Sequence, residues 1–234
     1  MELKGANFLV TGGSSGIGKA TAQLLIEHGA GVAITGRDEA KLKLVAESIG
    51  ALPILADVGN AADIERTYQE FLSHFDRLDG LINNAGIGGG WGSIADVDME
   101  AMRRVYEINV FGATMMGQRA AAIFRDQNAG NIVNIASTAG VKGFANGSIY
   151  ASSKFALRGL TQCWQADLRK HNVRVFLVNP SEVPTAFGNP DREERPDEAK
   201  KLSSQEIAHA IVSALQMDAR GFIPELTVWA TNPF

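Results

Sequence analysis

Short hydrophobic runs alternate with longer segments of helical periodicity from one end of the chain to the other. Most runs are rich in β-branched residues and nearly free of polar ones, which is typical of parallel strands covered on both faces. Strands are predicted at Asn7–Thr11, Val32–Thr35, Pro53–Ala56, Gly80–Asn83, Asn131–Ala136, Val173–Val178 and Phe222–Ala230. Helices are predicted between them at Gly16–His28, Glu39–Ile49, Ala61–Phe75, Met99–Asp126, Ile149–Lys170 and Ser204–Gln216.

This alternation predicts an α/β fold in which a doubly wound parallel sheet of about seven strands carries helices on both faces. The 234 residues show no internal repeat or low-complexity tract, so we expect one domain. Two connections break the rhythm. The glycine-rich segment Gly86–Asp96 is expected to form a loop at the carboxyl edge of the sheet. Residues Pro184–Leu202 combine three prolines with many charges and are expected to form a lid over a binding site.

Composition and charge exclude several classes of protein. Hydrophobic residues make up 45% and charged residues 21%, an ordinary globular balance. A net charge of -4 provides no broad basic field, so no nucleic-acid partner is expected. The N-terminal residues do not resemble a signal peptide, and no hydrophobic run approaches a membrane span, which favours a cytoplasmic protein without a membrane partner.

The metal- and thiol-bearing residues are few. Cys163 is the single cysteine, so an internal disulfide is excluded. We expect it to be a buried small hydrophobic residue, with a reactive thiol as the alternative. The four histidines are dispersed and none has the spacing of a metal-ligand pair, so no metal site is predicted.

The first predicted strand runs directly into a glycine-rich turn and then a helix. Gly12, Gly16 and Gly18 occupy this turn. Glycine permits positive φ and a close approach of pyrophosphate, while the helix N-terminus offers amide donors and partial positive charge. A tight strand-to-helix turn alone could also explain the glycines. Their place on the first strand of an alternating chain favours dinucleotide binding.

The spacing Thr11-Gly12-x-x-x-Gly16-x-Gly18 resembles the T-G-x-x-x-G-x-G signature of the short-chain dehydrogenase/reductase family. Other motifs of that family follow in the same order: Asn83–Asn84–Ala85–Gly86 after the fourth strand, Ser137 after the fifth, and Tyr150-x-x-x-Lys154. The resemblance spans nearly the whole chain. It implies a Rossmann-type fold and an oxidoreductase that transfers a hydride between NADP(H) and a carbonyl or secondary alcohol.

The resemblance implies catalytic roles for Asn109, Ser137, Tyr150 and Lys154. Tyr150 would be the general acid or base. Lys154 lies on the same helical face, and its charge is expected to lower the pKa of the phenol toward working pH. Ser137 would donate a hydrogen bond to the substrate oxygen. Asn109 would hold a water that relays protons to Lys154.

The resemblance also implies a cofactor site along the carboxyl edge of the sheet. Asp57 and Val58 would contact adenine, and the segment Pro180–Thr185 would contact the nicotinamide carboxamide. Ser181 departs from the family's glycine in that segment, and the C-terminus lacks the family's common glycine-rich ending. The implied cofactor-binding residues are Gly12, Ser14, Ser15, Gly16, Ile17, Gly18, Arg37, Asp57, Val58, Asn84, Ala85, Gly86, Tyr150, Lys154, Pro180, Val183 and Thr185.

The end of the second predicted strand bears on the choice of cofactor. An NAD enzyme uses an acidic residue there to bind the ribose hydroxyl. By comparison with the family, Gly36 occupies that position and Arg37 follows, which favours a 2′-phosphate and therefore NADP(H). Asp38 is the conflicting signal, but it also suits the N-cap of the next helix. NAD(H) therefore stays an alternative.

Two other functions and several substrates remain open. A non-catalytic NADP(H)-sensing protein could share the fold, whereas an epimerase or dehydratase of the extended family would need more residues after Pro180. A 3-oxoacyl thioester is one candidate substrate among ketones, aldehydes and secondary alcohols. The loop containing Trp91 and the lid would shape its pocket, and Arg192–Arg195 would be a solvated surface or part of that lid. By analogy with the family, two hydrophobic-faced helices would form a homodimer or homotetramer.

Overall fold

The computed structural model describes residues 1–187, 189 and 193–233. Its centre is a seven-stranded parallel sheet in the order β3-β2-β1-β4-β5-β6-β7, which confirms the predicted Rossmann-type fold. The order reverses between β1 and β4, the point where open α/β sheets bind ligands beyond the carboxyl ends of their strands. The strands are β1 (Asn7–Val10), β2 (Gly31–Gly36), β3 (Leu52–Leu55), β4 (Gly80–Asn83), β5 (Gly130–Ile135), β6 (Val173–Pro180) and β7 (Glu225–Val228).

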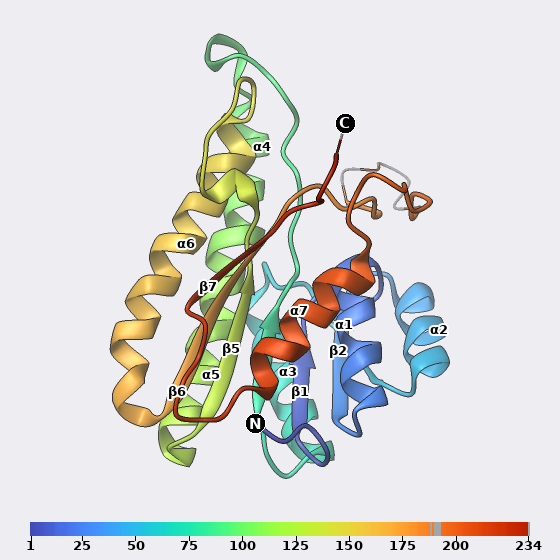
Figure 1. Ribbon diagram of the computed structural model, residues 1–234, viewed down its shortest axis with the longest axis vertical. Coiled ribbons are helices and arrows are strands. Elements are labelled where there is room, and N and C mark those ends of the chain that lie inside the picture. Colours follow the sequence, from blue (N-terminus) through green and yellow to red (C-terminus); the bar gives the residue numbers. More distant parts are fainter. Residues whose placement is uncertain (188, 190–192, 234) are drawn as a thin grey trace.

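Helices cover both faces of the sheet (Figure 1). Along β1, Phe8 and Val10 pack toward one helical layer and Leu9 packs toward the other, because successive side chains of a strand point to opposite faces. One layer contains α1 (Gly16–Glu27), α2 (Glu39–Ile49) and α7 (Ser204–Gln216), and the other contains α3 (Ala61–His74), α5 (Ala113–Gln127) and α6 (Ser148–Leu168).

The segment predicted as one helix, Met99–Asp126, is interrupted in the structure. It forms α4 (Met99–Tyr106), a wide π-helical turn η2 (Glu107–Gly112) and then α5. The end of this turn packs closely against the chain after β3. A Cβ at Gly112 would lie 2.6 Å from the carbonyl oxygen of Val58, so the chain touches backbone here. Such turns insert extra backbone into a helix and often occur at functional sites.

Two further predictions differ in detail. The last strand is shorter than Phe222–Ala230 and begins at Glu225, after Pro224, which cannot donate to a sheet ladder. Cys163 is exposed, contrary to the expectation of burial. The buried positions of α6 include Leu157 and Thr161, and two residues beyond Thr161 the helix has turned toward solvent.

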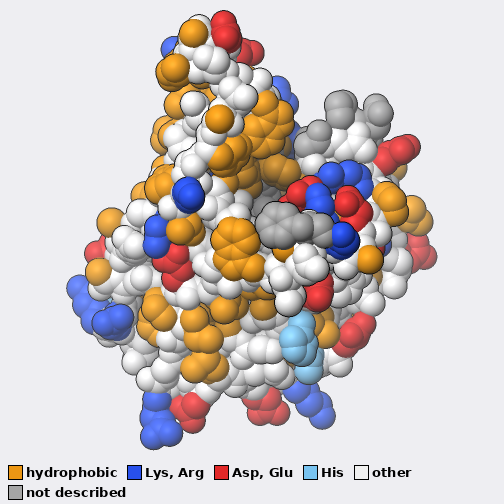
Figure 2. All heavy atoms as spheres, turned by 45° about the horizontal axis from the view of Figure 1, so that its top comes forward, with side chains coloured by type: hydrophobic (Ala, Val, Ile, Leu, Met, Phe, Trp, Pro, Cys, Tyr) orange, Lys and Arg blue, Asp and Glu red, His pale blue; other side chains and the backbone are white. Residues whose placement is uncertain are grey.

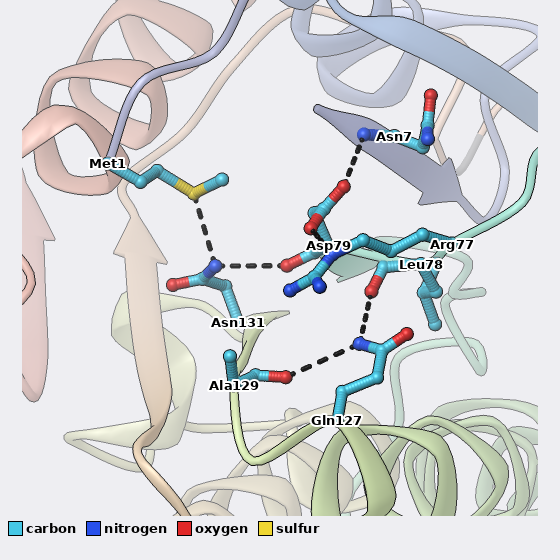
Figure 3. Close-up of polar contacts among 8 residues, drawn as sticks. All are labelled: Met1, Asn7, Arg77, Leu78, Asp79, Gln127, Ala129 and Asn131. Carbon is cyan, nitrogen blue, oxygen red and sulfur yellow. Dashed lines mark hydrogen bonds and ion pairs between the residues drawn. The ribbon is translucent and has the colours of Figure 1, made fainter. Parts of the chain in front are cut away.

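Polar contacts join the strands at the amino edge of the sheet, opposite the carboxyl edge (Figure 3). The side-chain amide of Asn131 donates to the carbonyl oxygen of Asp79 over 2.9 Å. The Asp79 carboxylate accepts a hydrogen bond from the backbone N–H of Asn7 at 2.9 Å and also pairs with Arg77. These contacts fix β1, β4 and β5 relative to one another, which in turn fixes the loops at their carboxyl ends.

Candidate active site

The glycine turn after β1 has the geometry that the sequence predicted. Gly12 and Gly16 have φ values of 63° and 51°, which side-chain-bearing residues rarely adopt. Gly18 is required for a different reason, since a Cβ there would lie 2.4 Å from both the carbonyl oxygen of Gly12 and the side-chain nitrogen of Asn84. The turn and the start of α1 therefore pack too closely for any larger residue.

Thr11 and Asn84 fasten this turn to the end of β4. The Thr11 hydroxyl accepts hydrogen bonds from the backbone N–H groups of Asn84 and Ala85, each at 3.0 Å. The Asn84 side chain donates in return to the carbonyl oxygens of Thr11 at 2.9 Å and Gly12 at 3.1 Å. The predicted segment Asn83–Gly86 therefore forms one wall of the glycine turn.

The N-terminus of α1 presents amide donors that suit an anion, and the Glu194 carboxylate accepts from the first of them, Gly16 N–H, at 2.8 Å. Ser15 is its N-cap residue, but the serine side chain makes no capping hydrogen bond, and the first turn contains no acidic residue. Ser14 lies beside β2, where a Cβ at Gly36 would meet its hydroxyl at 3.1 Å. Ile17 packs against the hydrophobic core. An anion at this position would meet the positive end of the helix dipole.

Arg37 and Asp57 meet at the carboxyl ends of β2 and β3. The guanidinium of Arg37 lies 3.6 Å from the Asp57 carboxylate, and the two side chains are 30% and 39% exposed. Asp57 also accepts a hydrogen bond from Gly59 N–H at 2.9 Å. Asp38 caps α2 by accepting from Lys41 N–H at 3.0 Å, as the sequence predicted. Val58 is buried beside η2.

The other end of the site is built on the first turns of α6. Tyr150 is half-buried, and the Ser137 hydroxyl lies close enough to its phenol to lower the phenol pKa in part. Ser137 stands at the end of β5, before the short turn η3 (Thr138–Gly140), where its hydroxyl also accepts from Ala139 N–H at 3.1 Å. The ammonium nitrogen of Lys154 lies 5.7 Å from the centre of the Tyr150 ring and donates to the Ile135 carbonyl at 2.9 Å.

Without a cofactor, the charge of Lys154 does not lower the pKa of Tyr150 as the sequence analysis expected. Burial raises the pKa of Tyr150 to about 12, and the nearby Ser137 hydroxyl offsets only part of this rise. Burial also lowers the pKa of Lys154 to about 8. Desolvation opposes the charged form of both groups. The predicted lowering of the Tyr150 pKa is therefore wrong for the free chain.

Asn109 reaches this region from the π-helical turn η2. Its side-chain oxygen accepts from Ile87 N–H at 2.8 Å, and its nitrogen donates to the Ile87 carbonyl at 2.9 Å. The same nitrogen donates to the Ser153 hydroxyl at 3.1 Å. A Cβ at Gly86 would lie 3.3 Å from Asn109 and 3.6 Å from the Lys154 ammonium. The structure thus brings all four predicted catalytic side chains to one edge of the sheet.

The segment after β6 lies between β7 and the glycine turn and forms another wall of the site. Pro180 is paired with β7, and Val183 packs against the core. Ser181 lies outside the left-handed region, and its N–H donates to Val228 at 2.9 Å, so this turn forms without the family's glycine. Thr185 lies on the glycine turn, with its methyl carbon 3.0 Å from the position of a Cβ on Gly16.

A cavity of about 440 Å³ extends from Arg37 to the start of α6. Its walls include Trp91 from the β4–α4 loop, Arg104 from α4, and Asn146 and Ile149 beside Tyr150. The predicted pocket loop therefore does line a cavity next to the site. Hydrophobic side chains gather toward the top of the face in Figure 2, near a mixed group of acidic and basic side chains.

Sequence reasoning missed several residues of the site. Phe187 packs against Tyr150 with ring centres 5.4 Å apart, and Phe144 packs at 5.6 Å against Trp91, the one residue of these that the sequence had assigned to the pocket. Glu194 also reaches the site, at a segment for which the sequence left open a solvated surface or part of the lid. No local pattern marks these residues because their partners lie far along the chain. Pro190 and Arg192 of the predicted lid lie outside the described residues.

Residues 6–196 match the family described as short chain dehydrogenase. The chain belongs to this family. It is 38% identical over 187 residues to 2,5-dichloro-2,5-cyclohexadiene-1,4-diol dehydrogenase of Sphingobium indicum, which covers 79% of this chain and 75% of that protein. The family assignment identifies an oxidoreductase and confirms the resemblance seen in the motifs.

Two solved structures show the same fold over nearly their whole length. The 3-ketoacyl-(acyl-carrier-protein) reductase from Brucella melitensis, complexed with NADH, is 27% identical with a TM-score of 0.89, covering 99% of this chain and 100% of that chain. An alcohol dehydrogenase from Thermococcus sibiricus, complexed with 5-hydroxy-NADP, is 25% identical with a TM-score of 0.88, covering 97% of each chain. The cofactors of these two proteins differ.

Neither a metal centre nor a membrane-spanning helix is found among the described residues. No three or more histidine, cysteine, aspartate or glutamate side chains come together there in a way that could hold a metal ion. None of the described helices has both the length and the hydrophobicity needed to cross a membrane.

Proposed function

We propose that this chain is an NADP(H)-dependent enzyme that interconverts a carbonyl group and a secondary alcohol, with Tyr150 as the general acid or base. The observation that carries this proposal is the position of the Tyr150 phenol. It lies near the Ser137 hydroxyl, has Lys154 beside its ring, and shares a sheet edge with the glycine turn.

The residues at this edge suit a nicotinamide dinucleotide. The positive-φ turn at Gly12 and Gly16 and the uncapped amides of α1 would hold its phosphates. Asn84, Ala85 and Gly86 would line the ribose, and Pro180, Val183 and Thr185 would hold the nicotinamide end. The bound cofactor supplies or accepts the hydride.

The side chains of the protein would manage the proton. A Tyr150 pKa of about 12 keeps the phenol protonated at neutral pH, so it holds the proton that carbonyl reduction needs, although a pKa nearer to working pH would make it a stronger acid. Ser137 would donate a hydrogen bond to the substrate oxygen and stabilise the developing alkoxide. Lys154, with a pKa of about 8, would return a proton to Tyr150, aided by a water held near Asn109.

The preference for NADP(H) rests on the end of β2. Gly36 places no side chain where an acidic residue would bind the ribose hydroxyl, and Arg37 stands next to it. Arg37 and Arg104 both line the cavity, and the Arg37 guanidinium is the group expected at the 2′-phosphate. A 2′-phosphate would compete with Asp57 for Arg37.

Two substrate classes have specific support. Similarity to the Brucella reductase over the full chain supports a 3-oxoacyl thioester. Similarity to the Sphingobium diol dehydrogenase supports a ring-shaped secondary alcohol. The exposed aromatic rings of Trp91, Phe144 and Phe187, at 66%, 47% and 40% exposure, offer a hydrophobic surface to either substrate.

A homodimer or homotetramer is also proposed, formed through the helices that carry the catalytic residues. Phe111 of η2 and Phe155 of α6 are 53% and 43% exposed in the isolated chain. Exposed aromatic side chains on adjoining helices are common where two copies pack across a two-fold axis.

The function is tested by following NADPH oxidation with a panel of 3-oxoacyl thioesters and cyclic ketones. We expect Tyr150→Phe to lower turnover at least ~10²-fold without weakening NADPH binding, because it removes only the proton donor. Tyr106→Phe, which removes a hydroxyl from α4, serves as the control. Retained turnover in Tyr150→Phe contradicts the assignment of the acid, and cofactor binding without any turnover in the wild type supports a sensor instead.

A further inference from the structure

We propose that Glu194 is an internal competitor of the cofactor: its carboxylate occupies the phosphate-binding end of α1, and a bound dinucleotide displaces it. The carboxylate oxygen of Glu194 accepts a hydrogen bond from the backbone N–H of Gly16 at 2.8 Å. This inference rests on the proposed function in one respect, that a nicotinamide dinucleotide binds at the glycine turn. It does not depend on NADP(H) in preference to NAD(H), because both carry the pyrophosphate.

The contact lies at the amide best placed for a phosphate. Gly16 is the first residue of the 12-residue helix α1, where backbone N–H groups have no partner within the helix. The N-cap residue Ser15 leaves these amides uncapped, and α1 has no acidic residue in its first turn. Glu194, 178 residues further along the chain, supplies the negative charge that this helix end otherwise lacks.

The residues around Glu194 hold it in position. We call residues 193–202 the strap. Arg195 donates to the Thr185 carbonyl at 3.4 Å and lies 3.9 Å from the Glu182 carboxylate, which also pairs with Lys201 at 2.6 Å. Thr185 itself lies against Gly16. The strap is thus attached to the segment expected at the nicotinamide, while Glu194 reaches the segment expected at the pyrophosphate.

Two anions cannot share this amide. A phosphate oxygen that bonds to Gly16 N–H must replace the Glu194 carboxylate, and both negative charges repel at this distance. The measured dissociation constant of the cofactor therefore equals the intrinsic one divided by the fraction of molecules in which the contact is open. Because Glu194 is exposed, the contact is weak, and we expect the factor to be about two- to fivefold.

The experiment compares dissociation constants of NADPH and NADH, measured by fluorescence titration, for the wild type and three variants. Glu194→Gln removes the charge and is expected to tighten binding of both dinucleotides by about two- to fivefold. Glu194→Asp keeps the charge but shortens the side chain, so it should tighten binding as well. Glu193→Gln is the matched control, since the only Glu193 contact in the described structure is its carbonyl, which accepts from Asn189.

The outcomes separate this inference from the proposed function. Unchanged binding in Glu194→Gln overturns it, as does an equal gain in Glu193→Gln, which would show a general effect of charge. Wild-type behaviour of Glu194→Asp also overturns it, because the direct contact is then unimportant. If the wild type prefers NADH but Glu194→Gln still tightens binding, the NADP(H) proposal fails and the inference stands. Failure of every variant to bind a dinucleotide overturns both.

Discussion

Replacing Lys154 with methionine tests the buried charge at the centre of the site. Lys154 is only 4% exposed, and burial lowers its pKa from 10.5 to about 8. Methionine keeps most of the packing of the stem and removes the ammonium group. The Ile135 carbonyl loses its donor, but that loss does not change with pH.

The size of the effect on the free energy of unfolding follows from the protons that Lys154 binds in the folded and the unfolded chain. Between about pH 8 and 10.5 the unfolded chain holds a proton that folded Lys154 has released, so the free energy of unfolding of the wild type rises with pH. At 1.36 kcal/mol per pKa unit, the buried charge costs about 3 kcal/mol at pH 7 and about 1 kcal/mol at pH 9.5. Tyr150, with its pKa of about 12, stays protonated over this range. The wild type should therefore gain about 2 kcal/mol relative to Lys154→Met between the two pH values.

The assay is urea unfolding of the wild type and Lys154→Met at pH 7 and pH 9.5. The difference in their free energies of unfolding is determined at each pH. Lys142→Met, at an exposed position before α6, should show the same difference from the wild type at both pH values. If the difference between the wild type and Lys154→Met is also the same at both pH values, the reasoning is refuted. Lys154 would then hold its proton equally well in the folded and unfolded chains.

Two more outcomes are expected. Arg37→Ala should weaken NADPH binding about tenfold and leave NADH binding nearly unchanged. A charge-assisted hydrogen bond contributes roughly 1.5–3 kcal/mol, and part of this is lost because Arg37 must first leave Asp57. A higher kcat/KM of the wild type with NADH than with NADPH would contradict this prediction. Light scattering at micromolar concentration should show at least a dimer, and Phe155→Glu should shift it toward monomer because the charge would be buried in the interface. A wild-type monomer would contradict the proposed assembly.

Much of the site could be predicted because its signals are local. The positive φ at Gly12 and Gly16 follows from the short distance between β1 and α1, and the Asp38 cap follows from its place before α2. The order of the motifs at Asn84, Ser137 and Tyr150 places each near a strand end or in a helix beside one. Parallel strands present all their carboxyl ends at one edge, so residues distant along the chain must meet there.

Local chemistry and chain order were enough to predict the alternation of strands and helices, the turn at Gly12–Gly18, and the set of side chains available for proton transfer. Each of these depends on hydrophobic periodicity, on the backbone freedom of glycine, or on chain order. The three-dimensional packing was needed to reveal the π-helical turn around Asn109, the ion pair of Arg37 with Asp57, the exposure of Cys163, and the contact of Glu194 with Gly16. It also decided that burial raises the pKa of Tyr150 and lowers that of Lys154. These properties depend on which distant segments pack together and on how completely they exclude water, and neither quantity is encoded in the neighbours of a residue along the chain.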